Sequence, residues 1–320
     1  MNETLKYAFA GTGYFAAKCL ETLARWKAPS FVATSPSAVA GRGKKISRSP
    51  VGEFVSGAMA GIPLIESPDI SRDPRVLEMK HDFGVDFTFV TDFGQFIREP
   101  LLSEAERVGC LNIHPSALPL YRGAAPIQRA LMDGACEIGV SVFKLSRGMD
   151  AGPVLLMERL EVGPEENFMS VRDRAAELGG RAFAEFAART PVEFWNFVPQ
   201  NDAEATTYAH KITEDEERID WNRTTAEIAN LVRALSPKPG AWTTMAGRRL
   251  TVLAARPSGG ENGETPHAAA GSLRLGRGTP AVACGDGFLE LITVLPEGRR
   301  PQPGESWKNG SRARAEERLI

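Results

Sequence analysis

The 320-residue sequence has few cysteines, and none is placed for a metal site or a disulfide framework. Cys19, Cys110, Cys136 and Cys284 stand singly, without a CxxC pair or a histidine at metal-ligand spacing. The sequence also lacks a signal-peptide-like start and any apolar run of about 18 residues, the length that a membrane-spanning helix needs. We therefore expect no metal and no membrane segment. Unpaired thiols favour a reducing compartment, so we expect a cytoplasmic protein.

A strong charge of either sign is also absent. The chain has 38 Lys and Arg against 40 Asp and Glu, a formal net charge of −2. This balance excludes a global basic field of the kind that binds nucleic acid unaided, so any RNA contact must come from a local patch. The hydrophobic content of 42% is typical of a folded protein, and 320 residues are enough for two domains.

The first 190 residues alternate between short apolar runs and amphipathic segments. The run at 6–10 ends at Gly11-Thr12-Gly13, and a helix-like pattern follows over 15–26. Further strands are expected at 31–34, 87–91 and 110–113, and helices at 51–60 and 72–82. This alternation predicts a Rossmann-like, doubly wound α/β sheet, in which ligands bind at the carboxyl ends of the strands.

After about residue 205 the pattern changes. A helical pattern remains at 225–235 and is followed by short strand-like runs separated by glycine-rich turns, at 249–255, 271–275, 281–284 and 288–294. Such strands predict a small OB-like β-barrel. We therefore expect a catalytic domain at 1–189, a linker at 190–207 and a second domain at 208–320.

The turn after the first strand allows two interpretations. Gly11 to Ala16 fits the G-x-G-x-x-A pattern of dinucleotide-binding sites. That pattern also needs an acidic residue about 20 positions further on, where this chain has Thr34-Ser35-Pro36. We favour a tight strand-to-helix turn over a nicotinamide site, which remains the alternative.

The segment 109–123 is the richest in side chains that can do chemistry. Asn112 and His114 are two residues apart on a predicted strand, so they point to the same side. Pro115 ends the pairing and leaves them at the rim of the sheet. An amide beside an imidazole can stabilise a developing oxyanion. Either residue alone would more often be structural, but the pair favours a catalytic site.

A second candidate is Asp150, between Gly148 and Gly152. An aspartate among glycines is more often a turn former. If it lies at a neighbouring strand end beside His114, it could orient and charge the imidazole.

These motifs together resemble the folate-dependent formyltransferase family. The resemblance rests on Asn112-Ile-His114-Pro-Ser, on the run 121–129 (YRGAAPIQR) and on Gly148-Met-Asp150-x-Gly152, and it extends over nearly the whole chain. It implies that Asn112, His114 and Asp150 are catalytic. It also implies that 10-formyltetrahydrofolate, the formyl donor, binds beside Ser116, Ala117, Leu118 and Pro119 and near Phe93, Gly94 and Gln95. No metal and no nicotinamide are implied.

Other segments resemble the members that formylate methionyl-tRNA. They are 40–45 (AGRGKK), 208–212 (YAHKI), 217–221 (ERIDW) and 233–237 (RALSP). The resemblance implies methionyl-initiator tRNA as the acceptor, with Arg42, Lys44 and Lys45 contacting the tRNA. We expect a monomer. The alternatives are a formyltransferase acting on a small amine such as an amino-sugar nucleotide, and an inactive tRNA- or folate-binding module.

Overall fold

The computed structural model describes residues 5–40, 45–102, 107–258, 268–276, 278–311 and 317–320. Contacts within the chain define two compact units, each assembled from three stretches. The first comprises 1–123, 138–160 and 172–208, and the second comprises 124–137, 161–171 and 209–320.

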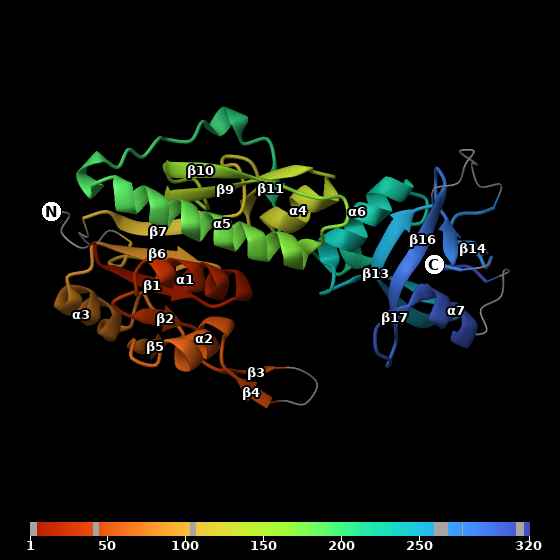
Figure 1. The fold of residues 1–320 in the computed structure, drawn as a ribbon, viewed down its shortest axis with the longest axis horizontal. Helices are drawn as coiled ribbons and strands as arrows, with labels where there is room; N and C mark the ends of the chain where they lie inside the picture. Colours follow the sequence, from red (N-terminus) through yellow and green to blue (C-terminus); the bar gives the residue numbers. More distant parts are fainter. Residues whose placement is uncertain (1–4, 41–44, 103–106, 259–267, 277, 312–316) are drawn as a thin grey trace. The chain divides into compact units, whose positions relative to one another are not determined.

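The first unit is built on a seven-stranded sheet with the order β10-β9-β7-β6-β1-β2-β5 (Figure 1). The strands are β1 (Tyr7–Gly11), β2 (Val32–Thr34), β5 (Leu64–Glu66), β6 (Phe87–Thr91), β7 (Gly109–His114), β9 (Glu137–Lys144) and β10 (Val154–Glu161). The five strands from β5 to β7 are parallel, whereas β9 runs antiparallel to β7. The Rossmann-like α/β class is confirmed, with an antiparallel edge that the alternating pattern did not predict.

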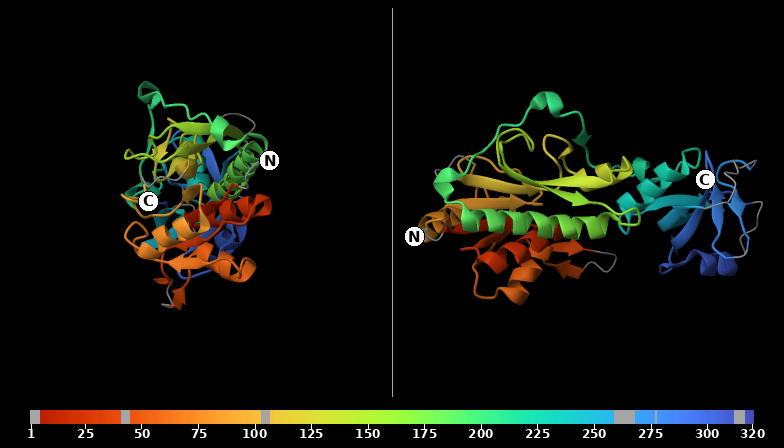
Figure 2. Two further views of the ribbon diagram at one scale, coloured as in Figure 1. Left: turned by 90° about the vertical axis from the view of Figure 1, so that its left-hand side faces the viewer. Right: turned by 45° about the horizontal axis from the view of Figure 1, so that its top comes forward.

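Helices α1 (Tyr14–Trp26), α3 (Pro74–Phe83) and α5 (Phe168–Arg189) follow strands of this sheet, and α2 (Pro50–Ala58) contacts β2 and β5. The long α5 lies along the sheet in Figure 1 and in the right-hand view of Figure 2. Tyr7 and Phe9 alternate along β1 with Ala8 and Ala10, and all four are buried, because both faces of a parallel sheet are covered.

The two faces of the sheet have different cores. On the face of α1 and α5, Phe183 is fully buried at the centre of an edge-on aromatic cluster with Trp26, Phe87, Phe89 and Trp195. The other core is largely aliphatic and includes Ala8, Ala10, Val76 and Val90. Side chains from alternating strand positions thus bind helices to the sheet on both sides.

The region around residue 40 is a hairpin followed by a helix. β3 (Ala38–Ala40) pairs antiparallel with β4 (Lys45–Ser47), and Ser49 then caps α2 by accepting the Gly52 N–H at 2.9 Å. The Ser49 hydroxyl also bonds the Thr34 hydroxyl at 2.6 Å, which fixes the start of α2 beside the end of β2.

The second unit contains a six-stranded antiparallel sheet with the order β12-β13-β16-β15-β14, and β17 pairs with β16. Its strands are β12 (Ala241–Met245), β13 (Arg248–Pro257), β14 (Leu273–Arg274), β15 (Ala281–Ala283), β16 (Phe288–Pro296) and β17 (Gln302–Pro303). The helices are α4 (Pro126–Met132), α6 (Thr225–Leu235) and α7 (Gly304–Ser311). The predicted antiparallel β domain after the α/β domain is confirmed.

Short elements complete the chain. β8 (Arg122–Gly123) pairs with β11 (Tyr208–Ala209), and single 3₁₀ turns lie at Val192–Phe194, Asp202–Glu204 and Asp215–Glu217.

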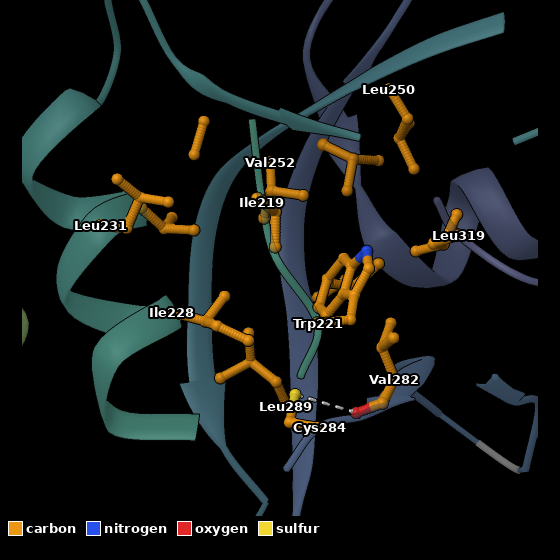
Figure 3. Packing of buried hydrophobic residues seen from close by; sticks show 14 of the residues in the cluster. Ile219, Trp221, Ile228, Leu231, Leu250, Val252, Val282, Cys284, Leu289 and Leu319 are labelled. Carbon is orange, nitrogen blue, oxygen red and sulfur yellow. Dashed lines mark hydrogen bonds between the residues drawn. The ribbon is translucent and has the colours of Figure 1, made fainter. Parts of the chain in front are cut away.

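The core of the second unit lies between α6 and the sheet (Figure 3). Ile228 and Leu231 project from α6 toward Val252 of β13 and Leu289 of β16. Trp221 fills the centre, and its indole N–H donates to the Thr243 hydroxyl at 3.0 Å, so the buried polar group is satisfied. α6 begins with a capping box between Thr224 and Glu227, which fixes where the helix starts.

Candidate active site

Asn112 lies on β7 with its side-chain amide oriented by a threonine. The Thr91 hydroxyl, at the carboxyl end of β6, donates to Asn112 Oδ1 at 3.2 Å and accepts the Ile113 N–H at 3.3 Å. Because Oδ1 is engaged, the Nδ2 group is the end that can donate to a ligand. Within the described part of the chain Nδ2 has no hydrogen-bond partner.

His114 ends β7 and is buried, with 5% of its surface exposed. Its Nε2 lies 3.0 Å from the backbone carbonyl of Tyr121. A carbonyl can only accept, so Nε2 carries the proton, and Nδ1 is the nitrogen whose protonation can change. Nδ1 lies 3.8 Å from Asp150 Oδ2.

Asp150 is held by the same segment that holds His114. Its Oδ2 accepts the backbone N–H of Gly123 at 2.9 Å, two residues after the carbonyl that binds His114. Both Tyr121 and Asp150 have positive φ angles, 54° and 49°, which are uncommon for residues other than glycine. Such conformations persist only where the surroundings impose them, and they concentrate at functional sites.

The route by which Asp150 reaches His114 differs from the expected one. We expected it at the end of a neighbouring strand, but β9 is antiparallel, so its last residue, Lys144, lies opposite Leu111 rather than His114. The 145–153 loop brings Asp150 back to the imidazole. Gly152 permits this path, since a Cβ there would lie 1.7 Å from the Lys144 carbonyl oxygen.

The segment 116–119 forms a tight turn against β9. The Ser141 hydroxyl donates to the Ser116 carbonyl at 2.7 Å and accepts the Leu118 N–H at 3.3 Å. The Ser116 hydroxyl donates to the Leu120 carbonyl at 2.7 Å. Gly139 gives Ala117 room, because a Cβ at 139 would lie 2.4 Å from the Ala117 backbone. Leu118 is nearly buried and forms a cis peptide bond with Pro119.

The side chains of 93–95 are largely used inside the protein. The Phe93 ring is buried in the aliphatic core. Gln95 Nε2 donates to the Ser67 carbonyl at 2.8 Å, and Oε1 accepts the Ile70 N–H at 3.0 Å. Gly94, with φ of 68°, leaves open space around its Cα. A role for this segment beside a ligand therefore rests on its backbone and on Gly94.

The glycine turn after β1 is filled by a carboxylate of the protein itself. Asp92 Oδ2 lies 2.0 Å from where a Gly13 Cβ would be, and the carboxylate accepts the backbone N–H groups of Phe15 and Ala16. Burial raises the pKa of this carboxyl group above its ordinary value. A helix N-terminus of this kind binds phosphate in dinucleotide sites, and here Asp92 takes that position. The turn interpretation accounts for these contacts.

Arg42 and Lys44 lie outside the described residues. Lys45 begins β4, opposite Ala40, and only its backbone is described. Of the three predicted tRNA-binding residues, the structure therefore places Lys45 alone, at the start of β4.

The part of the chain that the structure describes holds no cluster of three or more metal-ligating side chains. Nor does any helix in the described ranges combine the length and the apolar character needed to cross a membrane.

Two supporting residues were missed by the sequence analysis. Thr91 orients Asn112, and Tyr121 holds His114 by its carbonyl. Thr91 could have been found as the last residue of a predicted strand adjacent to the one that carries Asn112. The contact of Tyr121 is made by its backbone, so its residue type carries no signal.

Comparison with known proteins agrees with this fold. The formyl transferase family matches residues 5–186, and the formyl transferase C-terminal domain matches 211–312. The chain belongs to the formyltransferase family. It is 36% identical over 306 residues to the methionyl-tRNA formyltransferase of Cereibacter sphaeroides (strain KD131), covering 96% of each chain, and 35% identical over 320 residues to that of Acidithiobacillus ferrooxidans (strain ATCC 53993), covering all of each.

Solved structures share the fold at low sequence identity. An N-formyltransferase from Helicobacter canadensis, in complex with folinic acid and dTDP-3-aminofucose, superposes with a TM-score of 0.63 at 14% identity, covering 90% of this chain and 99% of that one.

Proposed function

We propose that this protein transfers the formyl group of 10-formyltetrahydrofolate to the amino group of methionyl-initiator tRNA. The relatives that match it along its whole length are methionyl-tRNA formyltransferases. The observation that carries the proposal is the arrangement of His114 and Asp150, both held by backbone groups of the 121–123 segment.

The reaction needs three functions from the protein. The amine attacks the formyl carbon and a tetrahedral oxyanion forms. As this intermediate collapses, the bond from the carbon to N10 of the folate breaks, the attacking nitrogen loses a proton and the leaving nitrogen gains one, which gives tetrahydrofolate. Asn112 Nδ2 would donate to the oxyanion, because Thr91 leaves that group unengaged. Protonated at Nδ1, His114 would be a second donor. The Asp150 carboxylate, 3.8 Å from Nδ1, would stabilise the imidazolium and help collect the proton.

The folate would bind beside Ser116, Ala117, Leu118 and Pro119, near Phe93, Gly94 and Gln95. The 116–119 turn suits this role because Ser141 fixes its backbone. A preformed turn loses little conformational entropy when a ligand binds.

The tRNA would be contacted by Arg42, Lys44 and Lys45, whose cationic side chains can bind phosphates. We propose 1–189 as the catalytic domain, 190–207 as the connection and 208–320 as the tRNA-binding domain. A monomer in the cytoplasm completes the proposal.

The test is formyl transfer from 10-formyltetrahydrofolate to charged initiator methionyl-tRNA, with uncharged tRNA, free methionine and an amino-sugar nucleotide as other acceptors. We expect transfer to the charged tRNA alone. Asn112→Ala should lower turnover by about 10²–10³-fold, the usual effect of removing one oxyanion donor. Transfer to the amino sugar instead would overturn the proposed acceptor, and full activity of His114→Ala would overturn the mechanism.

A further inference from the structure

Gln200, which is distant in sequence from Asp150, forms hydrogen bonds with the loop that carries Asp150. The Gln200 Nε2 group donates to the backbone carbonyls of Asp150 at 2.8 Å and Gly152 at 2.6 Å. The Oε1 of Gln200 accepts from Arg122 Nε at 3.0 Å and Nη2 at 2.8 Å. Both ends of one half-buried amide are thus engaged, the donor end by the Asp150 loop and the acceptor end by Arg122.

The arginine anchors the segment that holds both candidate catalytic side chains. The Arg122 side chain is only 5% exposed, so its guanidinium needs the partners that Gln200 and the exposed Asp202 provide. Arg122 lies between Tyr121, which accepts from His114, and Gly123, which donates to Asp150.

The position of Gln200 is itself fixed by backbone bonds on either side. Val198 and Val154 exchange two hydrogen bonds of 2.8 Å just after the Asp150 loop. Thr207 accepts the Tyr121 N–H at 3.0 Å through its carbonyl. The stretch from 198 to 207 therefore runs beside both the 121–123 segment and the end of the 145–153 loop.

We propose that Gln200 is a positioning residue for formyl transfer. It holds the Asp150 backbone in its positive-φ conformation and, through Arg122, keeps the 121–123 segment in register, so that the carboxylate faces His114. This inference rests on the proposed roles of Asp150 and His114. It gives Gln200, in the 190–207 connection, a role in supporting the candidate catalytic site.

The decisive variant is Gln200→Glu. A glutamate is nearly isosteric and still accepts from Arg122, but it turns two donors into acceptors that face the carbonyls of Asp150 and Gly152. The hydrogen bonds from Arg122 to residue 200 are therefore retained, whereas those from residue 200 to the Asp150 loop are lost. Gln200→Met, which removes both contacts, is a second variant in case Gln200→Glu folds poorly. The matched control is Asn201→Ala, which removes the neighbouring local bonds to Ala203 and Glu204 without touching the loop.

We expect Gln200→Glu to lower kcat by about 10- to 100-fold, because a displacement of about 1 Å at a catalytic group has effects of this size. The KM for the folate should change little, and Asn201→Ala should resemble the wild type. In an Asp150→Asn background, Gln200→Glu should add less than about a threefold loss, since both changes disable one unit.

The same assay separates failure of the inference from failure of the proposed function. A wild type that transfers no formyl group would reject the function. The positioning role would be rejected if the wild type is active, Asp150→Asn has lost most of its activity and Gln200→Glu nevertheless has a normal kcat. It would also be rejected if Gln200→Glu or Gln200→Met lowered kcat by the same factor in the wild type and in the Asp150→Asn variant.

Discussion

Replacing Gly152 by alanine tests how tightly the Asp150 loop is built. A Cβ at 152 would lie 1.7 Å from the Lys144 carbonyl oxygen, and contacts below 3.0 Å are essentially never seen. The loop must therefore move by about 1.3 Å or more. Lys144 cannot yield easily, because it is paired with Leu111 and its N–H donates to Pro153 at 2.9 Å.

Two effects of the substitution can be estimated. Overpacking of this kind typically costs about 1–3 kcal/mol of stability. Displacing Asp150 by about 1 Å should lower kcat/KM by about 10²-fold, because the bond from Gly123 to Oδ2, now 2.9 Å long, would be lost.

The measurement is formyl transfer under single-turnover conditions, combined with urea unfolding to show that the variant is folded. Gly148→Ala is the control in the same loop, since its Cβ would lie 3.0 Å from the Ala151 methyl and 4.0 Å from the Ser146 hydroxyl oxygen, and no backbone atom of a non-adjacent residue would lie within 4 Å. We expect the control to stay within a few fold of the wild type. A folded Gly152→Ala variant with normal kcat/KM would refute the view that this loop path positions Asp150.

Three further predictions concern stability, each measured by urea unfolding. Gly13→Ala should lose about 1–3 kcal/mol, because its Cβ collides with the Asp92 carboxylate; an unchanged free energy of unfolding would contradict that contact. Phe183→Ala should lose about 3–5 kcal/mol, as expected for a fully buried ring, and a loss below 1 kcal/mol would contradict its central place in the core. Glu216 is bonded to Arg129, which lowers the pKa of its carboxyl group from 4.5 to about 2. The pair therefore stabilises the folded state above about pH 4.5 and loses this contribution as the pH falls toward 2. Glu216→Gln should cost on the order of 1 kcal/mol at pH 7, after allowance for solvent screening, and this cost should shrink on acidification; a pH-independent difference would contradict it.

Local patterns predicted the elements of the fold well. β1, α1 and β6 lie within one residue of the predicted segments, because alternation and helical periodicity are properties of contiguous sequence. A strand at 140–143 was predicted, within β9, but its antiparallel direction was not, since strand direction depends on how the chain returns across the sheet. β10, β12, α7 and the 22-residue α5 were not predicted either, and length does not explain this, since β12 is as long as β1.

The candidate site was predicted in part. The sequence left open whether Asp150 is only a turn former or lies beside His114, and the structure places Asp150 Oδ2 3.8 Å from His114 Nδ1. The catalytic roles of Asn112, His114 and Asp150 stay predictions. Gln200 had no local signal, because its partners are 48, 50 and 78 residues away. The assignment of 93–95 and of Arg42, Lys44 and Lys45 to ligands stays a prediction.

The second compact unit has a consequence for how the chain can be divided and synthesised. α4 belongs to this unit with α6, and its Met132 packs against the core of the β domain. A fragment of 208–320 would lack this covering helix and expose part of an apolar core. On the ribosome, α4 is finished long before 209–320 emerge. α4 can pack against the β domain only after residues of 209–320 have been translated. The core of the second unit can therefore form only when most of the chain has been made.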